Sequence, residues 1–344
     1  MAVVAVLRSG VYGDKERERL QRSWLGIPSG RAGTFSVGWQ EMDNKDSRHN
    51  VVEADVTGSV RLANGLIAAL VFLAAATGIW RGLTSSAVGV GALVQALMLT
   101  QVVLAAAIIL LGSLVEGFGF GLSLGTRWPY SRNILSLLIH GDPEAAHRVV
   151  ATSLGLIGLL LVILSPDTAT VTGLVLIVAT ALFGMGTLYV LAGRAPAFVH
   201  GTHGFLAYAV LLSYLLGFLY PDLNFLAYLK ANIALHALLL AVFLGGMTTG
   251  QRGFGQAIGE FVKPTKPSHW VVSAHVVAAL LVVGTLGWLM PSYPVAFFLA
   301  VAQVAIGFLL FHGVNLRPRA PGAVVAIHQG MVLLITLAVV LPLR

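Results

Sequence analysis

Long apolar runs separated by short polar segments dominate the chain after residue 59. Each run approaches or exceeds the roughly 20 residues that a helix needs to cross a bilayer. The runs lie at about 60–80, 92–119, 145–164, 170–192, 199–219, 226–248, 268–290, 293–313 and 322–342. This pattern predicts an all-α, polytopic membrane protein built as a bundle of about nine spanning helices.

Residues 1–59 break this pattern. They carry closely spaced charges of both signs, among them Lys15, Glu16 and Arg17, and no sustained apolar run. We therefore expect an extramembrane segment. The chain as a whole is 57% hydrophobic and only 10% charged, with a mean hydropathy of +0.86. These values argue against a water-soluble fold and predict a multi-pass protein of the cell (plasma) membrane.

Charge and cysteine content exclude several functions. The formal charge of +7 could suit nucleic acid, but the basic side chains of the membrane part sit singly in short loops rather than in a stripe. No nucleic-acid partner is expected. The chain has no cysteine, which rules out disulfides, iron–sulfur clusters and cysteine-ligated haem or zinc on this chain.

An internal repeat divides the membrane part in two. Arg194-Ala195-Pro196 precedes His203 by nine residues, and Arg319-Ala320-Pro321 precedes His328 by the same nine. Glycines recur at the opening of each half: Gly112, Gly119 and Gly121, then Gly246, Gly253 and Gly255. The repeat predicts two four-helix units at 92–220 and 221–344, preceded by an additional helix and loop at 60–91 and by the charged segment 1–59.

Four histidines hold equivalent places in the two units: His147, His203, His275 and His328. Because successive helices cross the membrane in alternate directions, all four are expected near one membrane face, on the second and fourth helices of each unit. Two imidazoles at matching depth on two helices suit axial ligation of a haem iron. One alternative is helix–helix hydrogen bonding. Another is zinc or copper, although structural zinc usually takes four ligands.

The residues around these histidines resemble the haem A synthase family, whose members consist of two four-helix units with one histidine pair each. The resemblance covers about 92–344 and rests on the glycine-spaced run 112–121 before Trp128-Pro129, on Glu144-Ala145-Ala146-His147-Arg148, and on Gln303, Gly307 and His328-Gln329. It implies that His147 and His203 hold the substrate haem O, and that His275 and His328 hold a haem b cofactor. The implied reaction oxidises a ring methyl group of haem O to the formyl group of haem A.

By the same resemblance, Glu144 is the catalytic residue nearest the chemistry. One turn before His147, its carboxylate points to the same side of the helix and could move a proton. The alternative is that Glu144 and Asp142 only offset the positive end of the helix dipole, behind Pro143 in the first turn.

Basic residues gather on the face that holds the histidines, with nine of the twelve Lys and Arg beyond residue 62. The positive-inside rule assigns this face to the cytoplasm, whereas the family would place it outside. Haem propionates are anionic, so Arg148, Arg194 and Arg319 are expected to bind the cofactor. Their position then does not indicate which side of the membrane is cytoplasmic. The sidedness therefore stays open.

Five further histidines are weaker candidates: His140, His200, His236, His269 and His312. His200 lies three residues before His203 and is the alternative ligand. His236 is expected to make a polar contact inside the membrane. The other three lie near the loop face and could bond propionates.

Four positions depart from the family pattern. Leu124 and Ser131 stand where many members have a cysteine pair, so a thiol relay cannot operate. Val276 follows His275 where an arginine is expected, and His269 stands at the place equivalent to the glutamate of the first unit. The main alternative function is a di-haem b-type membrane cytochrome that carries electrons between quinol and a partner. A transporter with histidines along its path is a third class.

Expected partners are a haem O synthase or a terminal oxidase assembly of the respiratory chain, a quinol or ferredoxin-like electron donor, and the lipid bilayer. Assembly into a homo-oligomer is left open.

Overall fold

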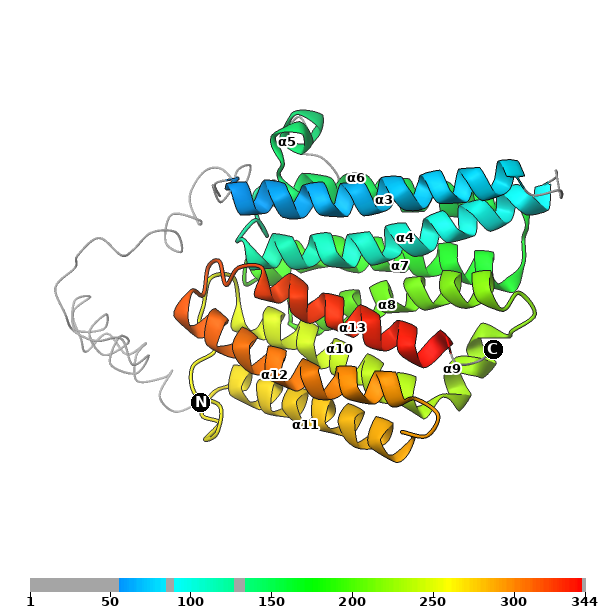
Figure 1. Ribbon diagram of the computed structural model, residues 1–344. Helices are drawn as coiled ribbons and strands as arrows, with labels where there is room; N and C mark the ends of the chain where they lie inside the picture. Colours follow the sequence, from blue (N-terminus) through cyan, green and yellow to red (C-terminus); the bar gives the residue numbers. More distant parts are fainter. Residues whose placement is uncertain (1–55, 85–89, 127–133, 342–344) are drawn as a thin grey trace, which may run out of the picture. The chain divides into compact units, whose positions relative to one another are not determined.

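The computed structural model describes residues 56–84, 90–126 and 134–341, and the regular elements of these segments are all helices (Figure 1). The described residues belong to one compact unit, 48–344. The all-α fold class is thereby confirmed. Residues 1–55, which make up most of the charged segment 1–59, lie outside the described residues.

Eleven helices make up the described part: α3 (Gly58–Thr84), α4 (Val90–Gly117), α5 (Ile134–His140), α6 (Pro143–Leu164), α7 (Thr168–Leu191), α8 (Phe198–Leu219), α9 (Phe225–Ala231), α10 (Ile233–Arg252), α11 (Pro267–Trp288), α12 (Pro294–Leu316) and α13 (Val324–Val340). Seven of them are long and apolar enough to cross a membrane, namely α4, α6, α7, α8, α10, α11 and α12. The chain is a multi-pass membrane protein.

These seven helices account for seven of the nine expected spans. The other two coincide with α3, a helix of 27 residues, and α13, a helix of 17 residues. The expected span 226–248 is interrupted at Asn232, where α9 ends and α10 begins. The Asn232 side chain accepts a hydrogen bond of 3.1 Å from the backbone N–H of Leu235, and an asparagine cap of this kind favours the start of a new helix.

Polar caps fix the ends of other spans. Asp142 caps α6 by accepting from the backbone N–H groups of Glu144 and Ala145 at 2.8 and 3.0 Å. Asp167 and Thr170 form a reciprocal capping box at the start of α7. Because each cap satisfies backbone donors that the helix leaves free, these short polar segments set where the apolar helices begin.

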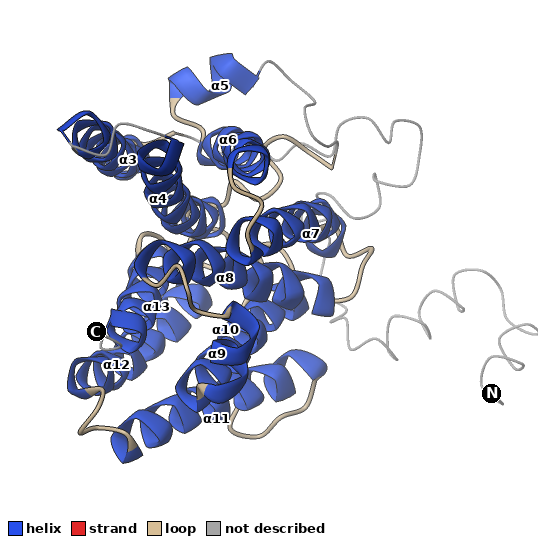
Figure 2. Cartoon of the chain, turned by 90° about the vertical axis from the view of Figure 1, so that its right-hand side faces the viewer, coloured by secondary structure: helices blue, strands red, loops and turns tan. Residues whose placement is uncertain are grey.

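The two repeats pack as halves of one bundle. In each half two helical hairpins form: α4 with α6 and α7 with α8, then α10 with α11 and α12 with α13. Helices α4, α8, α10 and α13 meet in the middle, where α4 contacts α8 and α13, and α10 contacts α8 and α13 (Figure 2). The contact of α4 with α13 is therefore the counterpart of that of α10 with α8.

Large apolar side chains cover the outer surfaces of the peripheral helices. Leu156 on α6, Val175 on α7 and Phe298 on α12 are 65%, 62% and 62% exposed. Contiguous exposed apolar surface of this kind would be costly in water, whereas in a bilayer it contacts lipid chains. The exposed surface thus supports the membrane assignment independently of helix length.

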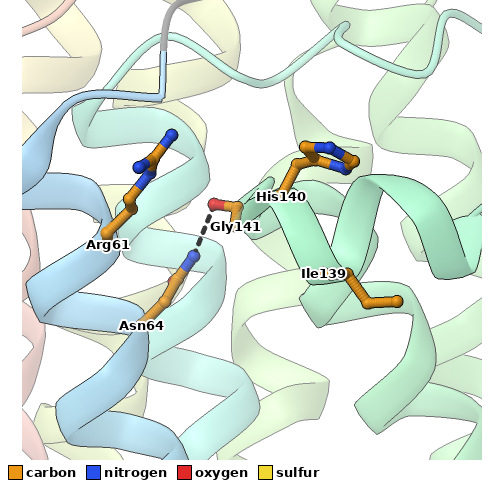
Figure 3. Close-up of a pocket in the computed structure, with 5 residues that line it drawn as sticks. All are labelled: Arg61, Asn64, Ile139, His140 and Gly141. Atoms are coloured by element: carbon orange, nitrogen blue, oxygen red, sulfur yellow. Dashed lines mark hydrogen bonds between the residues drawn. The ribbon is translucent and has the colours of Figure 1, made fainter.

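Helix α3 packs against α4 and is tied to the start of α6. The Asn64 side-chain amide donates a hydrogen bond of 2.7 Å to the backbone oxygen of Gly141 (Figure 3). Arg61, Ile139 and His140 line the same small pocket. The additional helix is therefore attached to the first repeat at the end of the bundle from which His147 enters the membrane.

Candidate functional site: two histidine pairs

The first pair consists of His147 on α6 and His203 on α8, and both helices pack against α4. The centroids of the two imidazole rings are 6.4 Å apart, and their planes make an angle of 59°. His203 rather than His200 is therefore the partner of His147.

The second pair consists of His275 on α11 and His328 on α13. Its ring centroids are 6.5 Å apart with an interplanar angle of 61°. The two pairs thus share their spacing and tilt although the sequences around them differ. The structure brings together all four histidines that the repeat singled out, in the pairing that the repeat predicts.

Three of the four imidazoles are held by the same hydrogen bond. The Nδ1 atoms of His147, His203 and His275 lie 3.1, 3.0 and 3.0 Å from backbone carbonyl oxygens of the neighbouring helix. The acceptors belong to Ile108, Thr180 and Ala241. A carbonyl oxygen can only accept, so Nδ1 carries the proton and Nε2 keeps its lone pair.

His328 is held by a side chain instead. The amide nitrogen of Gln303 lies 3.0 Å from both Nδ1 and the backbone oxygen of His328, and the amide oxygen is buried without a partner among the described residues. The backbone oxygen can only accept, so the amide nitrogen donates to it, and the same nitrogen faces Nδ1 as a donor. His328 thus differs from the other three histidines, whose Nδ1 lies against a carbonyl oxygen. Gln303 therefore controls the ring of His328.

The sequence leads us to expect that His328 ligates haem. On that expectation, replacing Gln303 by leucine should weaken haem binding at the second pair by about 10- to 100-fold, the usual effect of removing the hydrogen-bond partner of a ligating histidine. Replacing it by glutamate should instead retain the haem and lower its midpoint potential, because a carboxylate makes the imidazole a stronger donor. Redox titration of both variants checks this prediction. Equal affinity and equal potential in all three proteins would show that Gln303 does not act through His328.

A glycine lies against every one of the four imidazoles. A β-carbon built on Gly112, Gly184, Gly245 or Gly307 would come within 3.3, 3.0, 3.1 and 3.4 Å of Cε1 of His147, His203, His275 and His328, respectively. Each glycine follows by four residues the residue that contacts Nδ1: Ile108, Thr180, Ala241 and Gln303. The site thus contains one arrangement four times: an imidazole ring that packs against a neighbouring helix at a glycine.

Sequence reasoning found only part of this arrangement. It singled out Gly112 and Gly307, but it aligned Gly112 with Gly246, whereas Gly245 is the residue against His275. Gly246 instead contacts the backbone of α8 at His200 and Gly201. Gly184 was missed. The only signal in the sequence was a glycine inside an apolar span, which does not by itself identify the neighbouring ring.

Glu144 is buried and fully engaged. Its Oε2 accepts hydrogen bonds from the hydroxyl of Ser123 at 2.8 Å and from the backbone N–H of Leu124 at 3.0 Å, and its Oε1 pairs with Arg148 at 2.5 Å. Glu144 and Arg148 are 4% and 7% exposed. The carboxylate therefore fastens the loop after α4 to the first turn of α6, and Arg148 is bound to Glu144 rather than available at the surface.

Replacing Glu144 by glutamine should destabilise the protein by about 3–5 kcal/mol, because it removes the carboxylate that offsets the buried Arg148 charge. The double variant E144Q/R148M removes both charges and should recover much of this loss. Thermal unfolding in detergent measures both effects. The matched control is Glu260→Gln, an exposed glutamate at the same end of the bundle, and a wild-type melting temperature for Glu144→Gln would contradict the structural role.

Arg194 and Arg319 are exposed in the loops before α8 and α13. The stem of Arg319 runs beside Gly255, whose added β-carbon would come within 3.0 Å of Cγ. Both side chains occupy the end of the bundle from which His203 and His328 enter. Both are exposed at that face, and their binding of an anionic group stays a prediction.

A buried ion pair between the two repeats escaped sequence analysis. Arg252 at the end of α10 pairs with Glu116 at the end of α4, and it also donates to the backbone oxygens of Gln256 and Pro318 at 2.8 Å each. The partners are 136 residues apart in sequence, and no local pattern connects them. The pair joins the loops of the two halves on the histidine side of the bundle.

The remaining histidines have other environments. His269 is buried, and its Nε2 lies 3.0 Å from the backbone oxygen of Ile258. His312 packs its ring between Phe308 and Phe311. His140 contacts the backbone oxygen of Ser136 in its own helix, and His200 faces Gly246 and Gly250 of α10. His236 is exposed on α10.

Comparison with known proteins gives no family assignment: no family model, no curated protein and no solved structure matches the chain.

Proposed function

We propose that the chain is a membrane oxidoreductase that binds two haems, one between His147 and His203 and the other between His275 and His328. The observation that carries this proposal is the ring spacing of 6.4 and 6.5 Å. A ring nitrogen binds a transition metal at about 2 Å and the ring centroid lies roughly 1 Å further away, so imidazoles on opposite sides of one metal have centroids about 6 Å apart. Both pairs have the spacing that axial ligation requires.

The donor set also favours haem over a bare metal ion. Each pair offers two Nε2 atoms, and within the described segments no group of three or more His, Cys, Asp or Glu residues is placed to hold a metal ion. A porphyrin supplies four nitrogen donors of its own and needs only two axial ligands from the protein. Nδ1 bonded to a carbonyl, as in three of the four rings, is the arrangement that orients a ligating histidine and presents Nε2.

For the reaction we propose haem A synthase-type chemistry in the plasma membrane, for haem–copper respiratory oxidases: the four-electron oxidation of a ring methyl group of haem O to a formyl group. Either O₂ is the oxidant and yields the formyl group and one water, or the oxygen comes from water and four electrons and four protons pass to an external acceptor. The support is the order of Glu144, His147 and Arg148 in the first repeat together with the twofold histidine design. Bound haem would supply iron redox chemistry. The chain's own residues position the rings against the four glycines and offer Arg194 and Arg319 to the propionates.

The second candidate is a di-haem b-type cytochrome that carries electrons without modifying its haems. One observation favours it: both oxygens of the Glu144 carboxylate are occupied by Ser123, Leu124 and Arg148. A carboxylate fixed in this way holds a loop in place, and it would have to release a partner before it could move a proton. The two pairs also have nearly equal ring spacings and tilts, which do not distinguish a substrate site from a cofactor site.

Extraction of the haems from the purified chain, followed by mass analysis, separates the two candidates. Haem O, a hydroxylated intermediate or haem A beside haem b is expected for the synthase. Haem b alone, at two per chain, would contradict the synthase function and support the cytochrome function. A chain that binds no haem when expressed with an adequate haem supply would refute both.

A further inference from the structure

A groove of about 630 Å³ runs along the outside of the bundle between α8, α9 and α10. It is lined mainly by apolar side chains, including Phe205, Leu239, Leu240 and Phe243. Because α8 belongs to the first repeat and α10 to the second, the groove follows the boundary between the two halves. Leu240 is 45% exposed, so the groove opens sideways to the bilayer rather than enclosing its contents.

Two polar side chains lie at one end of this groove. Lys230 is in the last turn of α9 and His236 is in the first turn of α10, and both are exposed into the groove lining. Among the described residues, neither the Lys230 ammonium group nor the His236 ring has a hydrogen-bond or ion-pair partner. A cation and a hydrogen-bonding ring without protein partners, beside an apolar groove, suit an anionic group better than a neutral one.

The order of these residues along the bundle matches the layers of a lipid. Lys230 precedes the break at Asn232, at the end of the bundle opposite the histidine pairs, where short connections place it at the level of the headgroups. His236 lies one turn inside α10, and Leu239, Leu240 and Phe243 continue along the same helix towards the membrane centre. The cation would face the phosphate of a phospholipid, the imidazole ring would face its glycerol esters, and the apolar channel would hold an acyl chain.

We propose that this groove binds an anionic phospholipid, with its phosphate at Lys230, its ester oxygens at His236 and one acyl chain along Phe205, Leu239, Leu240 and Phe243. The bound lipid bridges the two repeats at the boundary of α8 with α10. Basic residues between transmembrane helices are a recurrent means of holding anionic headgroups. This site does not depend on the haem proposal.

Native mass spectrometry of the full chain, after addition of phosphatidylglycerol or phosphatidylcholine with identical acyl chains, tests the proposal. We expect phosphatidylglycerol to bind at one copy per chain with about a fivefold preference, which corresponds to about 1 kcal/mol for one lysine near the anionic headgroup. Lys230→Gln should abolish the preference. The matched control, Lys263→Gln, changes an exposed lysine at the opposite end of the bundle and should leave it intact.

Three outcomes would overturn the proposal. One is equal retention of the two lipids by the wild-type chain. Another is an unchanged preference in Lys230→Gln. The third is stoichiometric displacement of phosphatidylglycerol by an uncharged short-chain quinone, which would assign the groove to an electron carrier instead. His236→Leu provides a second test that keeps Lys230 in place, and it should reduce lipid retention.

Discussion

Replacing His147 by alanine is expected to lower the haem content of the purified chain from two to one. The first pair then has only His203, and a single imidazole cannot hold a macrocycle from both sides. His275→Ala should remove the other haem, and the double variant should contain none. Haem-to-protein ratios from pyridine extracts, together with redox titration of the remaining haem, measure the effect.

The matched control is His312→Ala, because His312 also lies on a membrane helix but packs against Phe308 and Phe311. It should retain both haems. If His147→Ala and His275→Ala each kept two haems of wild-type spectrum, the assignment of the pairs would be wrong. Loss of both haems from either single variant, with the protein still monodisperse, would show that the two sites are not independent.

Replacing Gly184 by leucine is expected to remove the haem of the first pair almost as completely as loss of a ligand. A β-carbon at this position would lie only 3.0 Å from Cε1 of His203, and leucine adds three further carbons beside the ring. We therefore expect the ring to be displaced from α7 and its hydrogen bond to Thr180 to be lost. Gly245→Leu should act in the same way on His275, where the distance is 3.1 Å. Haem stoichiometry and the low-spin absorption spectrum report the change.

Gly155 and Gly284 provide the controls for these variants. They lie in α6 and α11, and a β-carbon at either position would meet nothing within 4 Å. Gly155→Leu and Gly284→Leu should therefore keep both haems and the wild-type spectrum. The steric argument fails if Gly184→Leu and Gly155→Leu behave alike.

The positions of the spans could be predicted from the sequence because hydropathy and helix caps are local properties. Pro143 and Asp142 mark the start of α6, and the apolar run behind them has the length of a membrane crossing. Local signals can also mislead: the run 226–248 reads as one span, but Asn232 caps a new helix within it. The hydropathy average does not register a single capping residue.

The histidine pairing could be predicted because the repeat fixes which positions are equivalent. The identical spacing from Arg194 to His203 and from Arg319 to His328 selects His203 over His200, and the ring contact with His147 agrees. The glycine seats could not be derived in this way, because they depend on the rotation of each neighbouring helix about its own axis. That rotation is set by packing across the whole interface.

The environment of Glu144 and the pair of Arg252 with Glu116 depend on long-range contacts. The loop after α4 folds back so that Ser123 and Leu124 reach Glu144, and this approach has no sequence signature. Sequence alone therefore placed Glu144 near the haem edge or at the helix dipole. The structure adds a specific role, the attachment of a loop, in which Arg148 takes part.

The measurement that tests the central claim most directly is the haem stoichiometry and spin state of the purified wild-type chain. The paired imidazoles predict two haems per chain, both six-coordinate and low-spin in the ferric form by electron paramagnetic resonance, because each iron has an axial nitrogen on either side. A chain saturated with haem that contains only one, or whose ferric haems are high-spin and five-coordinate, would contradict the account.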